Sequence, residues 1–162
     1  ELREKGEQVP DRGWSPQINV GAAVLIPESY VPDLNVRLSL YRRLSDAEQS
    51  TDREALAAEL IDRFGPLPDE ASQLLRIVEI KANCRTANIA KIDMGPLGAV
   101  LTLRNDTFPN PMGLVGVIQK NPAAWKIRPD QKIVVKGDWP TPEDRLKAAE
   151  RMTAALAKVA AG

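Results

Sequence analysis

The sequence predicts an α+β fold with a helical first half and a small antiparallel sheet that is packed by the C-terminal helices. Three observations support this prediction. Apolar residues recur at helical spacing between residues 33 and 89, and two pairs of short β-rich runs follow between residues 90 and 136. A final helical pattern then runs from Thr141 towards the end of the chain, so helices and strands are segregated along the sequence.

The first two predicted helices follow an extended, apolar segment at residues 18–26. Asp33 is placed to cap a helix that ends near residue 47, because its carboxylate can accept from free backbone amides of the first turn. The apolar stripe of that helix consists of Leu34, Leu38, Tyr41 and Leu44. A second helix is expected from about Ser50 to Phe64, terminated by Gly65 and Pro66. The residues expected to face inward from it are Leu56, Leu60, Ile61 and Phe64.

The remaining elements follow from capping and turn residues. A third helix begins at Pro68 and ends near residue 89, with acidic residues in its first turn. Two strands at residues 90–94 and 99–104 flank Gly95-Pro96-Leu97-Gly98, which is typical of a hairpin. The later elements are a short helix at 111–120, an extended pair at 125–127 and 132–136, and a helix at 142–160.

Composition excludes several classes of function. The 162 residues contain 22 Lys and Arg and 22 Asp and Glu, so the chain lacks the basic surplus of a dedicated DNA-binding domain. Histidine is absent and Cys84 is the single cysteine, which rules out Ser-His-Asp catalysis, Cys/His zinc sites and an intramolecular disulfide. No phosphate-binding loop or dinucleotide fingerprint occurs, so no cofactor is expected.

The chain reads as part of a larger cytoplasmic protein. Its longest apolar run, from Val20 to Ile26, is far shorter than the ~20 residues of a membrane span. No signal sequence opens the chain, and a lone cysteine fits a reducing compartment. Because the first residue is Glu1 and residues 1–16 are polar and broken by glycine and proline, we expect an interdomain linker at 1–17 and one domain at 18–162.

Carboxylates of the second helix are the candidate site. Glu59 and Asp62 are three residues apart and share a face, and Asp52 falls near the same face seven residues earlier. Three interpretations remain open: a solvated face, a docking surface for a basic partner, or a general acid/base pair in a hydrolase, which would need burial in a pocket. Cys84 lacks a histidine to deprotonate it and is interpreted as a small buried hydrophobe.

Two stretches are more specific than their secondary structure requires. The first is Ile26-Pro27-Glu28-Ser29-Tyr30-Val31-Pro32-Asp33, continued by Arg37-Leu38-Ser39-Leu40-Tyr41-Arg42-Arg43-Leu44, and the second is Glu59-Leu60-Ile61-Asp62-Arg63-Phe64-Gly65-Pro66-Leu67-Pro68. At this spacing the chain, from about Ile18 onward, resembles the C-terminal domains of the bacterial transcription-repair coupling factors, the Mfd family.

The resemblance implies a regulatory part of a larger machine. Members of the family are ATP-dependent DNA translocases that bind stalled RNA polymerase and recruit the excision-repair protein UvrA. Their C-terminal domain carries no motor motifs, docks on a UvrB-like N-terminal module and covers its UvrA-binding surface. By motif position, Glu59 and Asp62 would supply the acidic side of that contact. The alternative is an accessory domain of the same machine that contacts nucleic acid.

Overall fold

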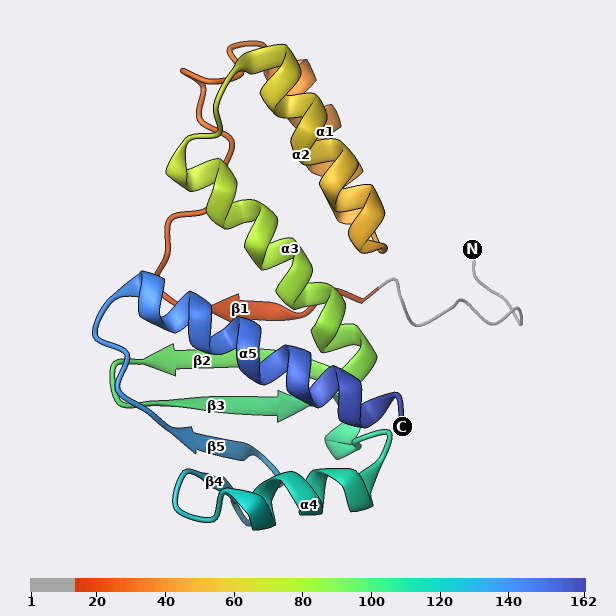
Figure 1. The fold of residues 1–162 in the computed structure, drawn as a ribbon, viewed down its shortest axis with the longest axis vertical. Helices are drawn as coiled ribbons and strands as arrows, with labels where there is room; N and C mark the ends of the chain where they lie inside the picture. Colours follow the sequence, from red (N-terminus) through yellow and green to blue (C-terminus); the bar gives the residue numbers. More distant parts are fainter. Residues whose placement is uncertain (1–13) are drawn as a thin grey trace.

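The computed structural model describes residues 14–162, and it divides them between a helical lobe and a sheet lobe (Figure 1). This arrangement confirms the α+β prediction. The helices are α1 (Leu34–Asp46), α2 (Ser50–Phe64), α3 (Asp69–Ala87), α4 (Pro111–Lys120), α5 (Pro142–Ala160) and a 3₁₀ turn at Arg104–Asp106. The strands are β1 (Gln17–Asn19), β2 (Ile89–Gly95), β3 (Gly98–Leu103), β4 (Trp125–Ile127) and β5 (Ile133–Lys136).

The five strands form a mixed sheet rather than a purely antiparallel one. Their order is β1-β2-β3-β5-β4, in which every neighbouring pair is antiparallel except β1 and β2. The hairpin predicted around residues 95–98 is present, with Gly95 paired to Gly98 and Pro96-Leu97 at the turn. The extended segment predicted for residues 18–26 becomes a strand only at Gln17–Asn19, because the chain then leaves the edge of the sheet towards the helical lobe.

Helix boundaries follow the predicted capping residues. The Asp33 carboxylate accepts from the Val36 amide at 3.0 Å, and the Thr141 hydroxyl accepts from the Asp144 amide at 3.1 Å. Helix α4 has the predicted bounds and is capped by Asn110, with proline at its first position. Gly65 ends α2 with φ +94°, a conformation that side chains other than glycine rarely adopt.

Two of the inward-facing stripes are only partly correct. In α1 the buried residues are Leu40 and Leu44, whereas the predicted stripe residues Leu34, Leu38 and Tyr41 are 58%, 46% and 36% exposed. In α2, Leu56 and Leu60 are buried as expected, but Ile61 is 48% exposed. The predicted stripes have the helical period. The face of each helix that its neighbours cover is, however, rotated around the helix axis relative to the predicted stripe, so part of each stripe faces solvent.

Each lobe has its own core, and α3 joins the two. The helical-lobe core consists of Ile26, Val31, Leu40, Leu44, Leu56 and Leu60. Leu74, Leu75 and Val78 on the first half of α3 pack against it. Further along α3, Ile77, Ile80, Cys84 and Ala87 enter the sheet-lobe core. Figure 1 shows α3 running from one lobe into the other, so a single rigid helix fixes how the lobes are placed.

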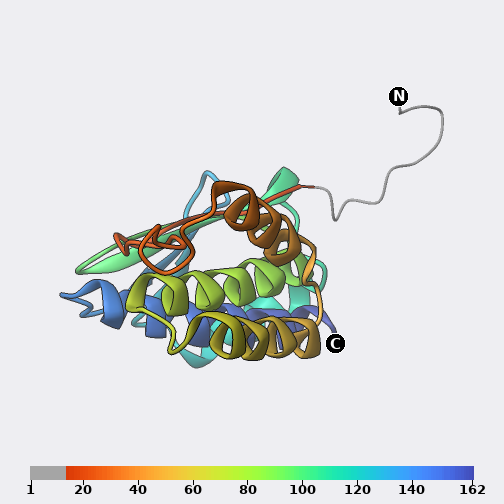
Figure 2. The same cartoon turned by 90° about the horizontal axis from the view of Figure 1, so that it is seen from above.

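Helices α3 and α5 lie on one side of the sheet (Figure 2). The side chains buried beneath them alternate along the strands, including Ile92 on β2, Leu101 on β3 and Ile133 on β5. Polar contacts fix the helices as well: the Arg76 guanidinium on α3 donates to the carboxylates of Glu143 and Glu150 on α5 at 2.8–3.0 Å. The sheet lobe is therefore held by both apolar packing and a charged network.

Among residues 14–162, no helix has the length and apolar character needed to cross a membrane. The predicted linker falls mostly at residues 1–13, which lie outside the described part of the chain. Its described end is attached to the sheet lobe: the guanidinium of Arg104 lies 5.0 Å from the centre of the Trp14 ring, and Arg85 donates to the Trp14 carbonyl. Gln17 belongs to β1.

Candidate functional site

The three predicted acids all lie on α2 and are accessible to solvent. Asp52 and Asp62 are exposed and Glu59 is half-buried, while Leu56 and Leu60 of the same helix are buried. We call Asp52, Glu59 and Asp62 the acidic face. Asp62 points away from the buried leucines because it lies about 160° around the helix from Leu60, whereas Asp52 and Glu59 lie at the margin of the buried face. Asp52 is exposed at that margin because it belongs to the first turn of α2.

Glu59 is held by two arginines. Arg43 on α1 donates from both terminal nitrogens to the two carboxylate oxygens of Glu59, at 2.8 and 2.6 Å. Arg63, one turn later on α2, donates to the same carboxylate at 3.0 Å. These hydrogen bonds lower the pKa of Glu59 from 4.5 to about 2, so its carboxylate is ionised at neutral pH. Its charge is matched within the domain.

Asp52 and Asp62, unlike Glu59, have no arginine or lysine partner within the described residues. Within residues 14–162 neither of them forms an ion pair, so both present an unneutralised negative charge to solvent. Asp62 lies three residues after Glu59, and Asp52 lies in the first turn of the helix. The acidic face therefore contains two free carboxylates and one that is already paired.

A shallow pocket of about 320 Å³ between α1 and α2 lies beside part of this face. Asp46, Asp52 and Glu59 line it together with Arg43, whereas Asp62 lies outside it. Sequence reasoning missed Asp46, the last residue of α1, because only the packing of α1 against α2 brings it near Asp52. The pocket is wide and its carboxylates are not buried, so it lacks the dry environment that a general acid/base pair requires.

Cys84 offers no alternative centre. It is fully buried, and burial raises the pKa of its thiol to about 12, so the reactive thiolate is not populated at neutral pH. This confirms its interpretation as a core residue. In the described part of the chain, no group of three or more Cys, Asp or Glu side chains is arranged to hold a metal ion.

Tyr30 and Tyr41 link the segment at residues 26–33 to helices α1 and α2. Tyr30 donates to the carbonyls of Leu60 and Gly65, at 3.1 and 2.7 Å, and its ring lies 5.7 Å from that of Phe64. Tyr41 accepts a hydrogen bond from the Ile26 amide at 2.7 Å. The segment at residues 26–33 is thereby fixed to the C-terminal end of α2, where Asp62 lies.

Comparison with known proteins gives a consistent result. The TRCF domain family model matches residues 20–114. The transcription-repair-coupling factor of Escherichia coli (strain K12) is 36% identical over 103 residues, 64% of this chain and 9% of the relative. The corresponding protein of Rickettsia conorii is 38% identical over 126 residues, 78% of this chain and 11% of the relative. The chain thus spans about a tenth of the length of these relatives.

The fold is matched as well. A solved structure described as the C-terminal domain of transcription-repair coupling factor superposes with a TM-score of 0.74. The match covers 91% of this chain and 95% of that structure at 14% sequence identity, so it shows a shared fold. These findings confirm the resemblance inferred from the two sequence stretches. The family model covers more than half of the chain, and the chain therefore belongs to the TRCF domain family.

Proposed function

We propose that this chain is a docking module without catalysis of its own, within a transcription-repair coupling factor that translocates on DNA with ATP. It docks through the acidic face on the UvrB-like N-terminal module of the same parent chain. In doing so it covers the surface that binds UvrA, and the parent, which engages RNA polymerase, stays inactive in repair. The observation that carries the proposal is that two exposed carboxylates on α2, Asp52 and Asp62, form no ion pair within residues 14–162 and lie on the same helix as Glu59.

The charge pattern suits a reversible contact. Exposed ion pairs contribute about 0.2–1 kcal/mol each, so two or three of them cannot hold two domains together permanently. A covalent linker between the modules adds an effective concentration of up to roughly millimolar, which makes a weak contact well populated. A contact of this kind opens when another interaction competes with it.

Because Glu59 is already paired within the domain, the three acids are expected to contribute differently to docking. Asp52 and Asp62 can accept a partner's arginine or lysine directly, whereas Glu59 must share or exchange Arg43 and Arg63. Replacing Glu59 also releases two arginines onto a surface that is proposed to meet a basic partner. We therefore expect Glu59→Gln to weaken docking through repulsion as well as through the lost carboxylate.

The test is a titration of the chain with the isolated N-terminal module of its parent at low salt. Asp52→Asn combined with Asp62→Asn should raise the Kd roughly 2- to 30-fold, from two pairs of about 0.2–1 kcal/mol. Asp138→Asn, an exposed acid on the sheet lobe, is the matched control and should leave the Kd unchanged. Arg43→Gln leaves Glu59 paired with Arg63 alone and removes a cation from this surface, so it should tighten the complex.

Two outcomes would contradict this function. A change in binding free energy for the α2 double variant that is no more than twice the change for Asp138→Asn would show that only net charge matters. An added excess of the chain that leaves UvrA binding to the N-terminal module undiminished would show that the UvrA-binding surface is not covered. The alternative, contact with nucleic acid, is distinguished by binding to a DNA duplex that falls steeply with salt.

A further inference from the structure

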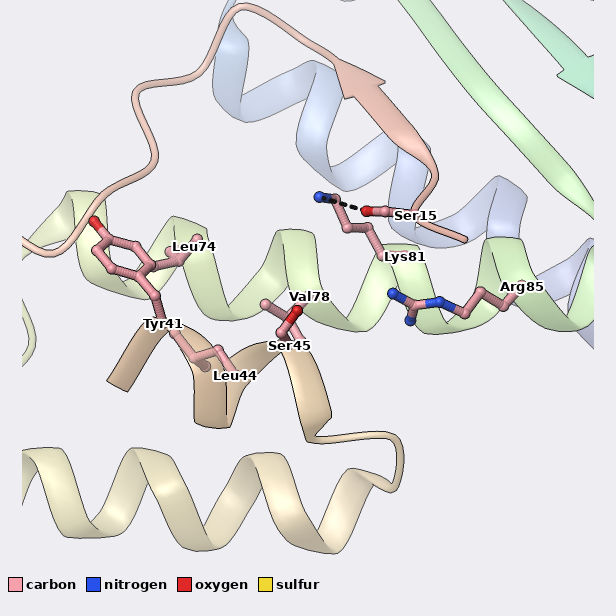
Figure 3. A pocket seen from close by; sticks show the side chains of 8 residues that line it. All are labelled: Ser15, Tyr41, Leu44, Ser45, Leu74, Val78, Lys81 and Arg85. Carbon is pink, nitrogen blue, oxygen red and sulfur yellow. Dashed lines mark hydrogen bonds between the residues drawn. The ribbon is translucent and has the colours of Figure 1, made fainter. Parts of the chain in front are cut away.

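A second surface of the helical lobe has the opposite charge. A pocket of about 280 Å³ lies between the end of α1, the middle of α3 and the segment that precedes β1 (Figure 3). Its apolar wall consists of Tyr41, Leu44, Leu74 and Val78. Lys81 and Arg85, one turn apart on α3, supply its charge, and we call it the basic pocket.

The two cations of the basic pocket have only neutral partners. The Lys81 ammonium lies 3.5 Å from the Ser15 hydroxyl oxygen, and Arg85 donates to the Trp14 carbonyl at 3.2 Å. In the described residues neither side chain forms an ion pair, in contrast to Arg43 and Arg76. Burial, and secondarily the positive charge of Arg85, lower the pKa of Lys81. A bound anion would relieve this repulsion.

Helix α3 by itself accounts for only part of this arrangement. Arg85 lies in the last turn of α3, where a cation interacts favourably with the negative end of the helix dipole. Lys81 lies a turn earlier and gains less from the dipole, yet it is placed in a partly desolvated pocket beside a second cation. The helix dipole therefore does not account for the position of Lys81 beside Arg85 in the wall of this pocket.

An exposed apolar stripe leads into the basic pocket. Leu34, Leu38 and Tyr41 lie along one side of α1 and are 58%, 46% and 36% exposed. At 1.5 Å per residue they span about 10 Å. Tyr41 belongs both to this stripe and to the wall of the pocket. A partner that covers the whole surface therefore needs apolar groups followed by an anion.

We propose that this surface binds a peptide segment of a partner protein in which apolar side chains are followed by acidic ones. The apolar side chains cover Leu34, Leu38 and Tyr41, and a carboxylate enters the basic pocket between Lys81 and Arg85. Nucleic acid fits less well, because a phosphate backbone requires a continuous row of cations, and here the approach to the pocket is apolar. The surface belongs to α1 and α3, so it is independent of the acidic face.

The probe is the hexapeptide acetyl-Leu-Ser-Leu-Ser-Glu-Glu-amide, titrated into the complete 162-residue chain and followed by methyl NMR. In an extended peptide the side chains at positions 1, 3 and 5 point the same way, and successive ones lie about 6.6 Å apart along the peptide. The two leucines can therefore cover the apolar stripe while the first glutamate reaches the basic pocket. Binding should shift the methyl signals of Leu44, Leu74 and Val78. It should also raise the pKa of Lys81, followed at its ε-carbon.

Matched variants separate the pocket from general charge effects. Lys81→Gln with Arg85→Gln should raise the Kd at least fivefold, and a peptide with both glutamates changed to glutamine should lose affinity by a similar factor. Lys120→Gln with Lys136→Gln removes two exposed cations elsewhere and should change nothing. Leu38→Ser, on the stripe, should weaken the peptide while leaving the fold intact, because Leu38 is already half exposed.

Several results would overturn the proposal. One is that the methyl NMR signals of Leu44, Leu74 and Val78 do not shift at millimolar peptide. Another is that Lys81→Gln with Arg85→Gln and Lys120→Gln with Lys136→Gln lose the same peptide affinity. Stronger, steeply salt-dependent shifts with a dT12 oligonucleotide would assign the pocket to nucleic acid. Tighter peptide binding after Glu7→Gln with Asp11→Asn would assign it to the chain's own preceding segment.

Discussion

The hydrogen bond between the Ile26 amide and the Tyr41 hydroxyl has a measurable consequence for stability. Ile26 is 3% exposed, and its N–H donates to the Tyr41 oxygen at 2.7 Å. Tyr41→Phe keeps the ring but removes the acceptor, so a buried amide is left without a partner. Leaving a buried donor unsatisfied costs about 1–3 kcal/mol.

Tyr30→Phe is the matched comparison, because it also removes one hydroxyl from the helical lobe. Here the hydroxyl is a donor, shared between the carbonyls of Leu60 and Gly65. A carbonyl tolerates the loss of a donor better than a buried amide tolerates the loss of an acceptor, so we expect about 0.5–1.5 kcal/mol. The free energy of unfolding should therefore fall more for Tyr41→Phe than for Tyr30→Phe.

Urea unfolding followed by circular dichroism at 222 nm measures both variants. Far-UV dichroism is suitable because both tyrosines lie in the helical lobe, whereas Trp125 and Trp139 pack against the sheet-lobe core. Hydrogen exchange adds a local readout: the Ile26 amide should exchange roughly 5- to 160-fold faster in Tyr41→Phe, which corresponds to about 1–3 kcal/mol. An equal or smaller loss for Tyr41→Phe, or an unchanged Ile26 exchange rate, would refute the reasoning.

Two further predictions concern Cys84 and Glu59. Because Cys84 is fully buried with a thiol pKa of about 12, it should resist Ellman's reagent at pH 8 until urea unfolds the domain, and rapid stoichiometric labelling of the native chain would contradict this. The pKa of Glu59 falls from 4.5 to about 2 on folding, so its stabilising contribution is complete above pH 4.5 and is lost as the pH falls towards 2. The difference in unfolding free energy between the wild type and Glu59→Gln should shrink over that interval; a difference that stays constant down to pH 2 would show that the ion pairs do not stabilise the fold.

Local signals in the sequence account for most element boundaries. Asp33 and Thr141 cap helices through contacts three residues away, and Gly65 ends α2 through its own backbone conformation. These interactions are contained within one turn, so the residue types alone predict them. Burial cannot be predicted from residue type in the same way. Leu38 and Leu40 lie two residues apart on α1, and only the packing of α2 and α3 against α1 leaves Leu38 exposed and Leu40 buried.

The candidate site divides in the same way. The pair between Glu59 and Arg63 is one helical turn apart and was predictable, whereas Arg43 reaches Glu59 across sixteen residues because α1 packs beside α2. The basic pocket was not predicted at all. Lys81 and Arg85 share a face of α3 by their spacing, but the apolar wall comes from α1 and the residue facing Lys81 is Ser15. No pattern within one helix contains that information.

The zero net charge of the chain therefore conceals two oppositely charged surfaces on one lobe. A basic partner meets free carboxylates on α2 and would be repelled at Lys81 and Arg85, while an acidic peptide has the reverse preference. Such charge arrangements select the orientation of a partner more than they add affinity. Salt should separate the two surfaces: docking on the acidic face depends on exposed charges and weakens as they are screened. Binding at the basic pocket keeps the part that comes from apolar contact with Leu34, Leu38 and Tyr41.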